Sequence, residues 1–109
     1  MSVIFVYVTA SSADEAMSIG RAAVQRGLAA CANIVPQTKS IYRWEGKVEE
    51  TDEILLLLKT TADHFTALSG LVRSMHSYKT PCIAAVPVTH VDASYAAWIG
   101  GAVTTGGSG

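Results

Sequence analysis

The hydrophobic positions of the chain follow two patterns, one typical of strands and one typical of helices. Residues 3–9 form a continuous β-branched and aromatic run, which predicts a buried central strand. The polar residues 11–14 precede a segment with apolar residues every three or four positions, which predicts a helix that ends near Gly27. Gly20 lets that helix lie close to the sheet. The predicted buried face consists of Ala16, Met17, Gly20, Ala23, Val24, Gly27 and Leu28.

Two long extended segments, residues 29–44 and 47–59, flank the dipeptide Glu45-Gly46. A two-residue turn with glycine at positive φ is typical of a tight hairpin. Each arm could contain about a dozen residues, roughly twice the common strand length, so the hairpin is expected to project from the domain. Pro36 predicts a bulge or an edge position because proline cannot donate a hydrogen bond. The same register places Lys39 opposite Asp52.

The second half of the chain repeats the plan of the first. Residues 60–63 open a predicted second helix, residues 83–88 form a predicted fourth strand, and Asp92 begins a short last helix. The order predicts an α+β fold of the ferredoxin-like, split βαβ kind, with an antiparallel sheet in the strand order 4-1-3-2. Residues 1–101 are expected to form this single domain, and residues 102–109 to form a linker-like, disordered tail. The apolar face of the second helix is expected to contain Phe65, Leu68, Leu71, Val72 and Met75.

The composition adds an expectation about assembly. Half of the 109 residues are hydrophobic and only 16% are charged. A domain of this size has too little interior for so much apolar surface, so we expect some of it to be buried between subunits. The net charge of −1 gives no long-range attraction to a nucleic acid, and none is expected as a partner.

Several features predict a cytoplasmic protein. Two cysteines do not make a disulfide framework of the secreted kind. The N-terminal segment lacks a basic region and a cleavage signature, and its apolar run is too short to span a bilayer, so no membrane association is expected.

His76 and Cys82 lie six residues apart, between the second helix and the fourth strand. Imidazole and thiolate are ligands for soft and borderline metal ions, so the pair is a candidate metal site. A histidine at a helix C-terminus also interacts favourably with the helix dipole, and both interpretations are open. Cys31 lies in the second strand, about 14 Å from Cys82 across three interstrand gaps. An intrachain disulfide or shared metal is therefore not expected, although neighbouring subunits could bring the cysteines together.

Other polar residues have weaker candidate roles. Cys31 and His76, oriented by Asn33, could form the nucleophile and base of a thiol hydrolase. Lys59 either extends into solvent or meets an anion in a cleft between subunits. The remaining expectations are His64 at the surface, His90 in a loop, Met75 in the core, and the carboxylates of residues 49–53 along a solvated edge.

Two motifs closely resemble one known family. Residues 29–36 read AACANIVP and residues 40–47 read SIYRWEGK. They resemble the CutA family of divalent-cation tolerance proteins, and the resemblance extends over residues 3–99. Its further matching positions are Glu53, Lys59-Thr60, His76, Tyr78, Pro81 and Tyr95-x-x-Trp98-Ile99.

The resemblance implies a homotrimer of ferredoxin-like subunits whose long hairpins pair with neighbours. It also implies an association with copper or another divalent cation such as zinc or cadmium, and no established catalysis. The architecture is similar to PII-type signalling trimers, so a signalling or scaffold trimer that binds a small ligand or protein partner is the alternative. We expect metal ligands among His76, Cys31 and Cys82, a ligand cleft with Asn33, Trp44, Lys59 and Tyr78, and trimer contacts at Ile41, Tyr42, Trp44 and Trp98.

One segment departs from the family pattern. Where the family usually reads His-Pro-Tyr-Glu-x-Pro-Glu, this chain has Ser77, Lys79 and Cys82 at the second, fourth and last positions. Two carboxylates are missing, and a thiol replaces one of them. This exchange favours soft ions such as Cu(I) over hard cations.

Overall fold

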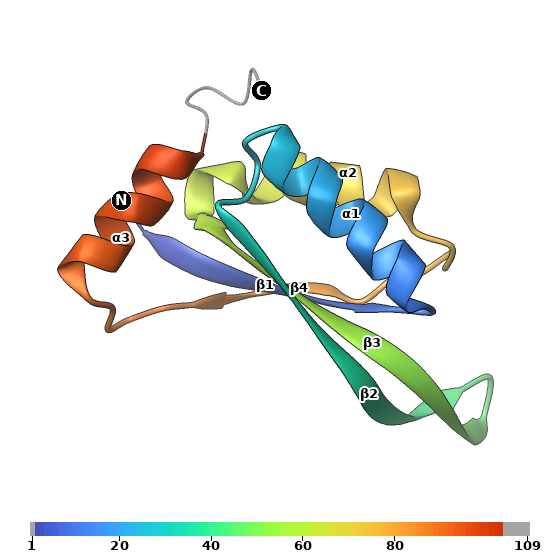
Figure 1. Ribbon diagram of the computed structural model, residues 1–109. Helices are drawn as coiled ribbons and strands as arrows, with labels where there is room; N and C mark the ends of the chain where they lie inside the picture. Colours follow the sequence, from blue (N-terminus) through green and yellow to red (C-terminus); the bar gives the residue numbers. More distant parts are fainter. Residues whose placement is uncertain (1, 104–109) are drawn as a thin grey trace.

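The computed structural model describes residues 2–103 and confirms the predicted order of elements. Figure 1 shows helices α1 (Ala13–Gln25) and α2 (Phe65–Met75) above a strongly twisted sheet, and α3 (Ala93–Ala102) at the end of the sheet. The elements are β1 (Val3–Ala10), α1 (Ala13–Gln25), β2 (Cys31–Trp44), β3 (Lys47–Thr61), a 3₁₀ turn (Ala62–His64), α2 (Phe65–Met75), β4 (Ile83–Pro87) and α3 (Ala93–Ala102).

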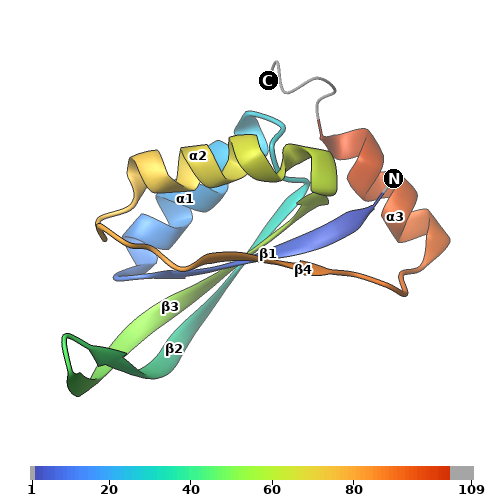
Figure 2. The same cartoon turned by 180° about the vertical axis from the view of Figure 1, so that it is seen from behind.

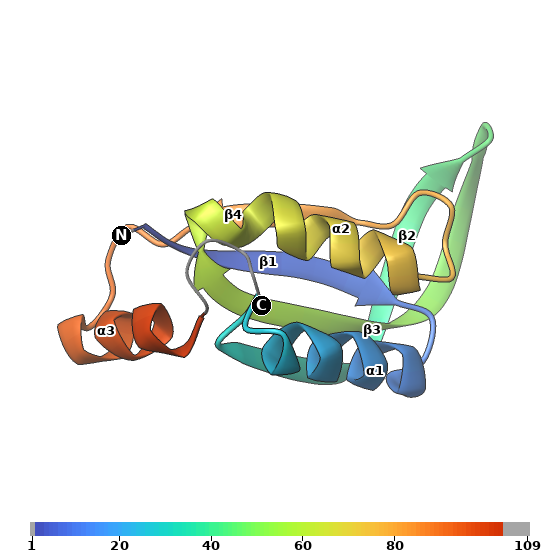
Figure 3. The same ribbon diagram turned by 90° about the horizontal axis from the view of Figure 1, so that it is seen from above.

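The sheet has the order β2-β3-β1-β4, and all neighbouring strands run antiparallel. This is the predicted order 4-1-3-2 read from the other edge. Helices α1 and α2 lie side by side over one face of the sheet, seen from above in Figure 3. We call this the helix-covered face and the opposite one the open face. Because side chains alternate along a strand, Leu56 and Leu58 point to the helix-covered face, while Leu57 and Lys59 point to the open face.

The main hydrophobic core lies between the two helices and the sheet. Leu56 and Leu58 are fully buried there with the alternate residues of β1. Gly20 allows close contact, as predicted, because a Cβ at that position would lie 3.1 Å from the Cβ of Ala32. The prediction for the face of α1 was partly wrong. The helix buries Ala16, Ile19, Gly20 and Ala23, whereas Met17 and Val24 are each 41% exposed.

The error has a simple geometric cause. Positions 16, 19, 20 and 23 form one narrow stripe at helical spacing, and Met17 and Val24 lie beside that stripe. The start and end of α1 agree with the sequence. The Ser12 hydroxyl accepts a hydrogen bond from the Glu15 amide, and Gly27 follows the helix with φ of 70°.

The β2–β3 hairpin projects from the body of the domain, as Figures 1 and 2 show. Glu45 and Gly46 both have positive φ, at 50° and 78°, which is the backbone of a type I′ turn. The register shifts between Val35 and Thr38, so the bulge predicted at Pro36 is confirmed. Lys39 pairs with Asp52 across the hairpin, also as predicted.

Two expectations about the second helix were wrong. His64 is 3% exposed rather than solvent-facing, and its Nδ1 lies 2.8 Å from the hydroxyl of Thr61, which is also buried. Met75 is 38% exposed because it occupies the last turn of α2, beyond the covered face. His90 follows β4 in an exposed loop, as predicted.

A smaller core lies at the end of the sheet where β1 begins. Ile99 of α3 packs there with Val3, Ala30 and Val103. Asp92 begins α3, since its carboxylate accepts a hydrogen bond from the Tyr95 amide. Of the predicted tail, Ala102 is the last residue of α3 and Val103 is 7% exposed, while residues 104–109 lie outside the described residues. No helix within residues 2–103 has the length and hydrophobicity to cross a membrane.

Candidate functional site

The turn between α2 and β4 is built around the buried ring of His76. Its side chain is completely inaccessible, and both ring nitrogens have partners. Nε2 lies 2.7 Å from the Thr9 carbonyl oxygen, which can only accept, so Nε2 carries the proton and donates. The amide of Tyr78 donates to Nδ1 over 3.0 Å. The neutral ring in this tautomer satisfies both contacts and leaves no lone pair for a metal ion.

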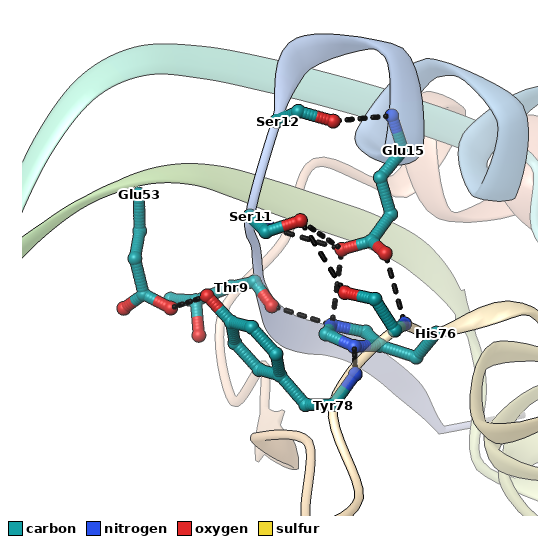
Figure 4. Close-up of polar contacts among 8 residues, drawn as sticks. Thr9, Ser11, Ser12, Glu15, Glu53, His76 and Tyr78 are labelled. Atoms are coloured by element: carbon teal, nitrogen blue, oxygen red, sulfur yellow. Dashed lines mark hydrogen bonds and ion pairs between the residues drawn. The ribbon is translucent and has the colours of Figure 1, made fainter.

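Glu15 holds the same turn against the start of α1. One carboxylate oxygen accepts the amide of Ser77 over 2.9 Å, and the other accepts the amide of Ser11 over 3.0 Å. Burial alone would raise the pKa of Glu15, but the hydrogen bonds from Ser77 and Ser11 and the nearby His76 ring lower it from its usual value. The carboxylate therefore stays ionised and fixes the turn on α1 (Figure 4).

Tyr78 connects this turn to the open face of the sheet. Its hydroxyl donates to a carboxylate oxygen of Glu53 on β3 over 2.9 Å (Figure 4). Partial burial, together with the hydrogen bond and negative charge of Glu53, raises the pKa of Tyr78 to about 12. The phenol is therefore a neutral donor at physiological pH. Glu53 itself is only 8% exposed.

A cleft of about 660 Å³ opens between this turn and the hairpin, and we call it the hairpin cleft. Its volume lies within the range of small-molecule sites, about 300–1,000 Å³. Strands β1, β2 and β3 contribute to its walls, and the segment before β4 closes one side. The lining includes Tyr7, Tyr42, Trp44, Glu53, Tyr78 and Cys82.

Two lysines also line the hairpin cleft, with different surroundings. Lys39 forms an ion pair with Asp52, and both side chains are 77% exposed. Lys79 lies on the turn, and within residues 2–103 it forms no ion pair.

Cys82 is exposed, and partial burial and the charge of Glu53 raise the pKa of its thiol. The cleft thus combines aromatic walls, a buried carboxylate and a protonated thiol.

The four residues expected in a ligand cleft divide between two places. Trp44 and Tyr78 line the hairpin cleft. Asn33 and Lys59 lie farther along the sheet, where the Cys31 thiol donates to the Asn33 amide oxygen over 3.8 Å. The Lys59 ammonium lies 5.3 Å from the centre of the Phe5 ring and 5.7 Å from that of Tyr95. These are cation–π distances, so aromatic rings hold Lys59 at the α3 end.

The three expected metal ligands do not meet within one chain. Cys31 shares a row of the sheet with Lys59, Phe5 and Val86, whereas His76 contacts Thr9, four residues along β1. That offset alone is about 13 Å. Cys82, just before β4, is also four residues from that row and on the opposite edge strand. The pairing of the two cysteines within one chain is excluded, as expected, and both are free.

The same offset shows that Cys31 and His76 of one chain cannot act together as the nucleophile and base of a hydrolase. A catalytic cysteine and its base need hydrogen-bond contact, but Cys31 and His76 lie at different ends of the open sheet. Within the described residues, no three His, Cys, Asp or Glu side chains form a group that could hold a metal ion.

Glu53 and Tyr7 are site residues that sequence reasoning missed. Glu53 was placed with its acidic neighbours on a solvated edge, and that holds for the exposed Glu49, Glu50 and Asp52. Glu53 differs because it stands two and four residues before Leu55 and Leu57 on the open face of β3. This period-two relation to an apolar run is a signal that could have separated it from the other acids.

The residues expected at a trimer interface are all exposed in the single chain. Ile41 is 69% exposed, Tyr42 43%, Trp44 53% and Trp98 51%. Three of them lie on the projecting hairpin and one on α3. In the single chain these large aromatic and aliphatic side chains are therefore accessible on the hairpin and on α3.

Comparison with known proteins gives one consistent match. The family model of the CutA1 divalent ion tolerance protein matches residues 4–102. A divalent-cation tolerance protein CutA of Thermus thermophilus is 44% identical over 94 residues, which cover 86% of this chain and 91% of the relative. A CutA homolog of Xenopus laevis is 42% identical over 94 residues, and the match spans only 62% of that relative's length.

Solved structures agree with the sequence match. The structure of the divalent cation tolerance protein Cut A1 from Thermus thermophilus superimposes with a TM-score of 0.91 at 40% identity, covering 94% of this chain and 99% of that one. Sequence, strand order and overall structure therefore lead to the same conclusion: the chain belongs to the CutA1 divalent ion tolerance protein family.

Proposed function

We propose that this protein is a homotrimeric, cytoplasmic binding protein for copper or other divalent metal ions, without a catalytic activity of its own. The names of its relatives refer to tolerance of divalent cations and to no reaction. The observation that carries the proposal is the exposed Cys82 thiol in the hairpin cleft, beside the buried Glu53.

Two features of the single chain support assembly into the proposed trimer. The hairpin exposes Ile41, Tyr42 and Trp44, which a second copy could cover. Within the described residues, one chain also lacks a three-ligand group, so a metal site needs donors from more than one subunit. Assembly through the hairpins would meet both needs, because Cys82 and the hairpin line the same cleft.

Cys82 is the best-placed of the three candidate ligands. The lone pair of His76 Nδ1 accepts the Tyr78 amide, so His76 acts as a positioning residue for the turn that carries Cys82. Cys31 is held near Asn33 and Lys59 at the other end of the sheet. A metal ion that displaces the thiol proton would meet a thiolate donor at Cys82, and such a donor favours Cu(I), Zn²⁺ or Cd²⁺ over hard cations.

Native mass spectrometry during titration with copper and zinc tests the proposal, because it reports subunit number and bound metal together. We expect a trimer that binds copper, a loss of copper in Cys82→Ser, and retention in the matched control Cys31→Ser. A monomer at micromolar concentration, or unchanged copper stoichiometry in Cys82→Ser, would refute the corresponding part of the proposal.

The hairpin cleft supports a second candidate function, the binding of a small ligand in a signalling or scaffold trimer. Its volume of about 660 Å³ is much larger than a metal ion requires, and tyrosine and tryptophan form much of its wall. Calorimetric titration with candidate ligands would separate this function from metal binding, since ligand binding should persist in Cys82→Ser.

A further inference from the structure

We propose that Gln37 is a positioning residue for assembly. Its backbone forms a one-residue bulge that turns the distal half of the β2–β3 hairpin, residues 38–51, towards a second copy of the chain. The inference rests on the proposed trimer and names the residue that sets the direction of the contact between subunits. It does not depend on metal binding, and it agrees with a hairpin that the assembly covers.

The bulge lies at the point where the hairpin leaves the rest of the sheet. Strand β1 ends at Ala10, which pairs with Ile54 of β3. Beyond Ile54 the hairpin is therefore a ribbon of two strands. On the other side of Ile54, strand β2 has two residues, Pro36 and Gln37, where a regular strand would have one, because the register shifts there.

The backbone of Gln37 is held in an unfavourable conformation. Its φ is 64°, in the left-handed region, and within residues 2–103 the only other non-glycine residue with positive φ is Glu45 of the hairpin turn. This region is disfavoured for L-residues because Cβ approaches the following carbonyl oxygen. The Gln37 side chain is exposed, so its burial does not offset the strain. Strain of this kind is often retained where function depends on the local geometry.

The consequence of the bulge is the direction of the distal hairpin. A bulge bends its strand and increases the local twist. Figure 3 shows β2 and β3 turning away from the line of β1 and β4 beyond the end of β1. The turned segment carries Ile41, Tyr42 and Trp44, which are 69%, 43% and 53% exposed. A neighbouring subunit can cover these side chains only if the hairpin leaves the domain in the matching direction, so the bulge is a condition for assembly.

Deletion of Gln37 tests this role without changing the pairing on either side. The pairs before and after the bulge keep their partners, and Pro36 alone would then lie opposite Ile54. Proline is tolerated at that position because β2 is an edge strand of the single chain. The fully buried Leu56 and Leu58 pair with residues that precede the bulge. We therefore expect a folded chain with a straighter hairpin.

Native mass spectrometry and sedimentation over a dilution series measure the protein concentration at which half of the chains are trimeric. Deletion of Gln37 should raise this concentration by about a hundredfold or more, because the aromatic residues of the hairpin no longer reach their positions on the neighbour. Thermal unfolding of the same protein should remain cooperative. This separation of assembly from folding is not expected of a residue that only stabilises the chain.

Two substitutions that keep the bulge are the matched controls. Gln37→Gly is the conservative rescue, because glycine adopts positive φ without strain, and it should leave assembly unchanged within about threefold. At equal protein concentration it should also raise the midpoint of thermal unfolding by about 4 °C. Gln37→Ala removes the side chain and keeps an L-residue, so unchanged assembly there assigns the effect to the backbone.

Two results would overturn the inference. If the protein without Gln37 assembles as readily as the wild type, the bulge does not direct the contact, while the trimer itself stands. If the wild type is a monomer at micromolar concentration, the trimer and the inference fail together. Should the deletion prevent folding, Gln37→Val decides the question, because a β-branched residue disfavours positive φ and should weaken assembly by about tenfold. Unchanged assembly of Gln37→Val would then overturn the inference.

Discussion

The two faces of the four-stranded sheet use the same alternating sequence in different ways. On the helix-covered face, Leu56 and Leu58 are completely buried under α1 and α2. On the open face, Leu57 is partly exposed and Glu53 is a buried carboxylate beside a cleft. The first face is packed within one chain, whereas the second leaves Leu57 partly exposed and places the Glu53 carboxylate beside a cleft. The main hydrophobic core therefore lies on one face of the sheet and the candidate functional site on the other.

Substitution of neighbouring leucines is the strongest test of this contrast. Leu56→Ala should lower the free energy of unfolding by about 3 kcal/mol, because it leaves a cavity in a packed core. Leu57→Ala, one residue along on the open face, should cost about 1 kcal/mol or less in the dissociated chain. Urea unfolding at low protein concentration measures both.

The dependence of these two unfolding costs on protein concentration gives a second test of the contrast between the two faces. If the open face is covered in an oligomer, the cost of Leu57→Ala should grow with protein concentration, while that of Leu56→Ala should change little. Equal costs for the two leucines at high dilution would contradict the division of the sheet into a packed face and a partly exposed one.

The turn around His76 lies between the two faces of the sheet. Removal of the His76 ring should lower the free energy of unfolding by an amount between those of the two leucine substitutions. His76→Ala leaves the Thr9 carbonyl and the Tyr78 amide without their buried partner, which should cost about 2–3 kcal/mol. Thermal unfolding and calorimetry give the value. His90→Ala is the matched control, since His90 lies in an exposed loop. A cost for His76→Ala no larger than for the control would show that the ring does not fix the turn.

Much of the fold could be predicted from sequence because it depends on local patterns. Ser12, Gly27, Pro36 and Glu45-Gly46 each specify a cap, a helix end, a bulge or a turn, and all are confirmed. Hydrophobic periodicity was less reliable for residues at the edge of the buried face of a helix. Met17 fits an apolar repeat by spacing but lies outside the stripe that reaches the sheet.

The candidate site was harder to predict because its contacts join distant segments. Tyr78 and Glu53 are 25 residues apart, and His76 meets Thr9 across 67 residues. Residue type alone indicated His76 as a metal ligand, but a lone pair is available only if no backbone amide occupies it. The sequence shows which side chains are present, but whether their lone pairs can bind a metal ion depends on tertiary contacts.

The hydrogen bond between Tyr78 and Glu53 should have a smaller effect on stability than the His76 ring, and a distinct pH signature. Tyr78→Phe should cost about 1.5 kcal/mol at neutral pH, because one hydrogen bond to a charged group is lost. The pKa of Tyr78 is raised from 10.0 to about 12, so the folded state holds this proton more tightly than the unfolded state. The stabilisation is therefore fully present below pH 10 and is lost as the pH rises towards 12.

The difference in phenolate absorbance between the wild type and Tyr78→Phe isolates this one group. The difference should develop near pH 12, and in Glu53→Gln it should move towards 10 because the negative charge that opposes ionisation is gone. A difference signal already complete near pH 10 would show that the phenol is not held by Glu53. In that case the carboxylate would lack its neutral donor, and the open face would differ from the helix-covered face only in exposure.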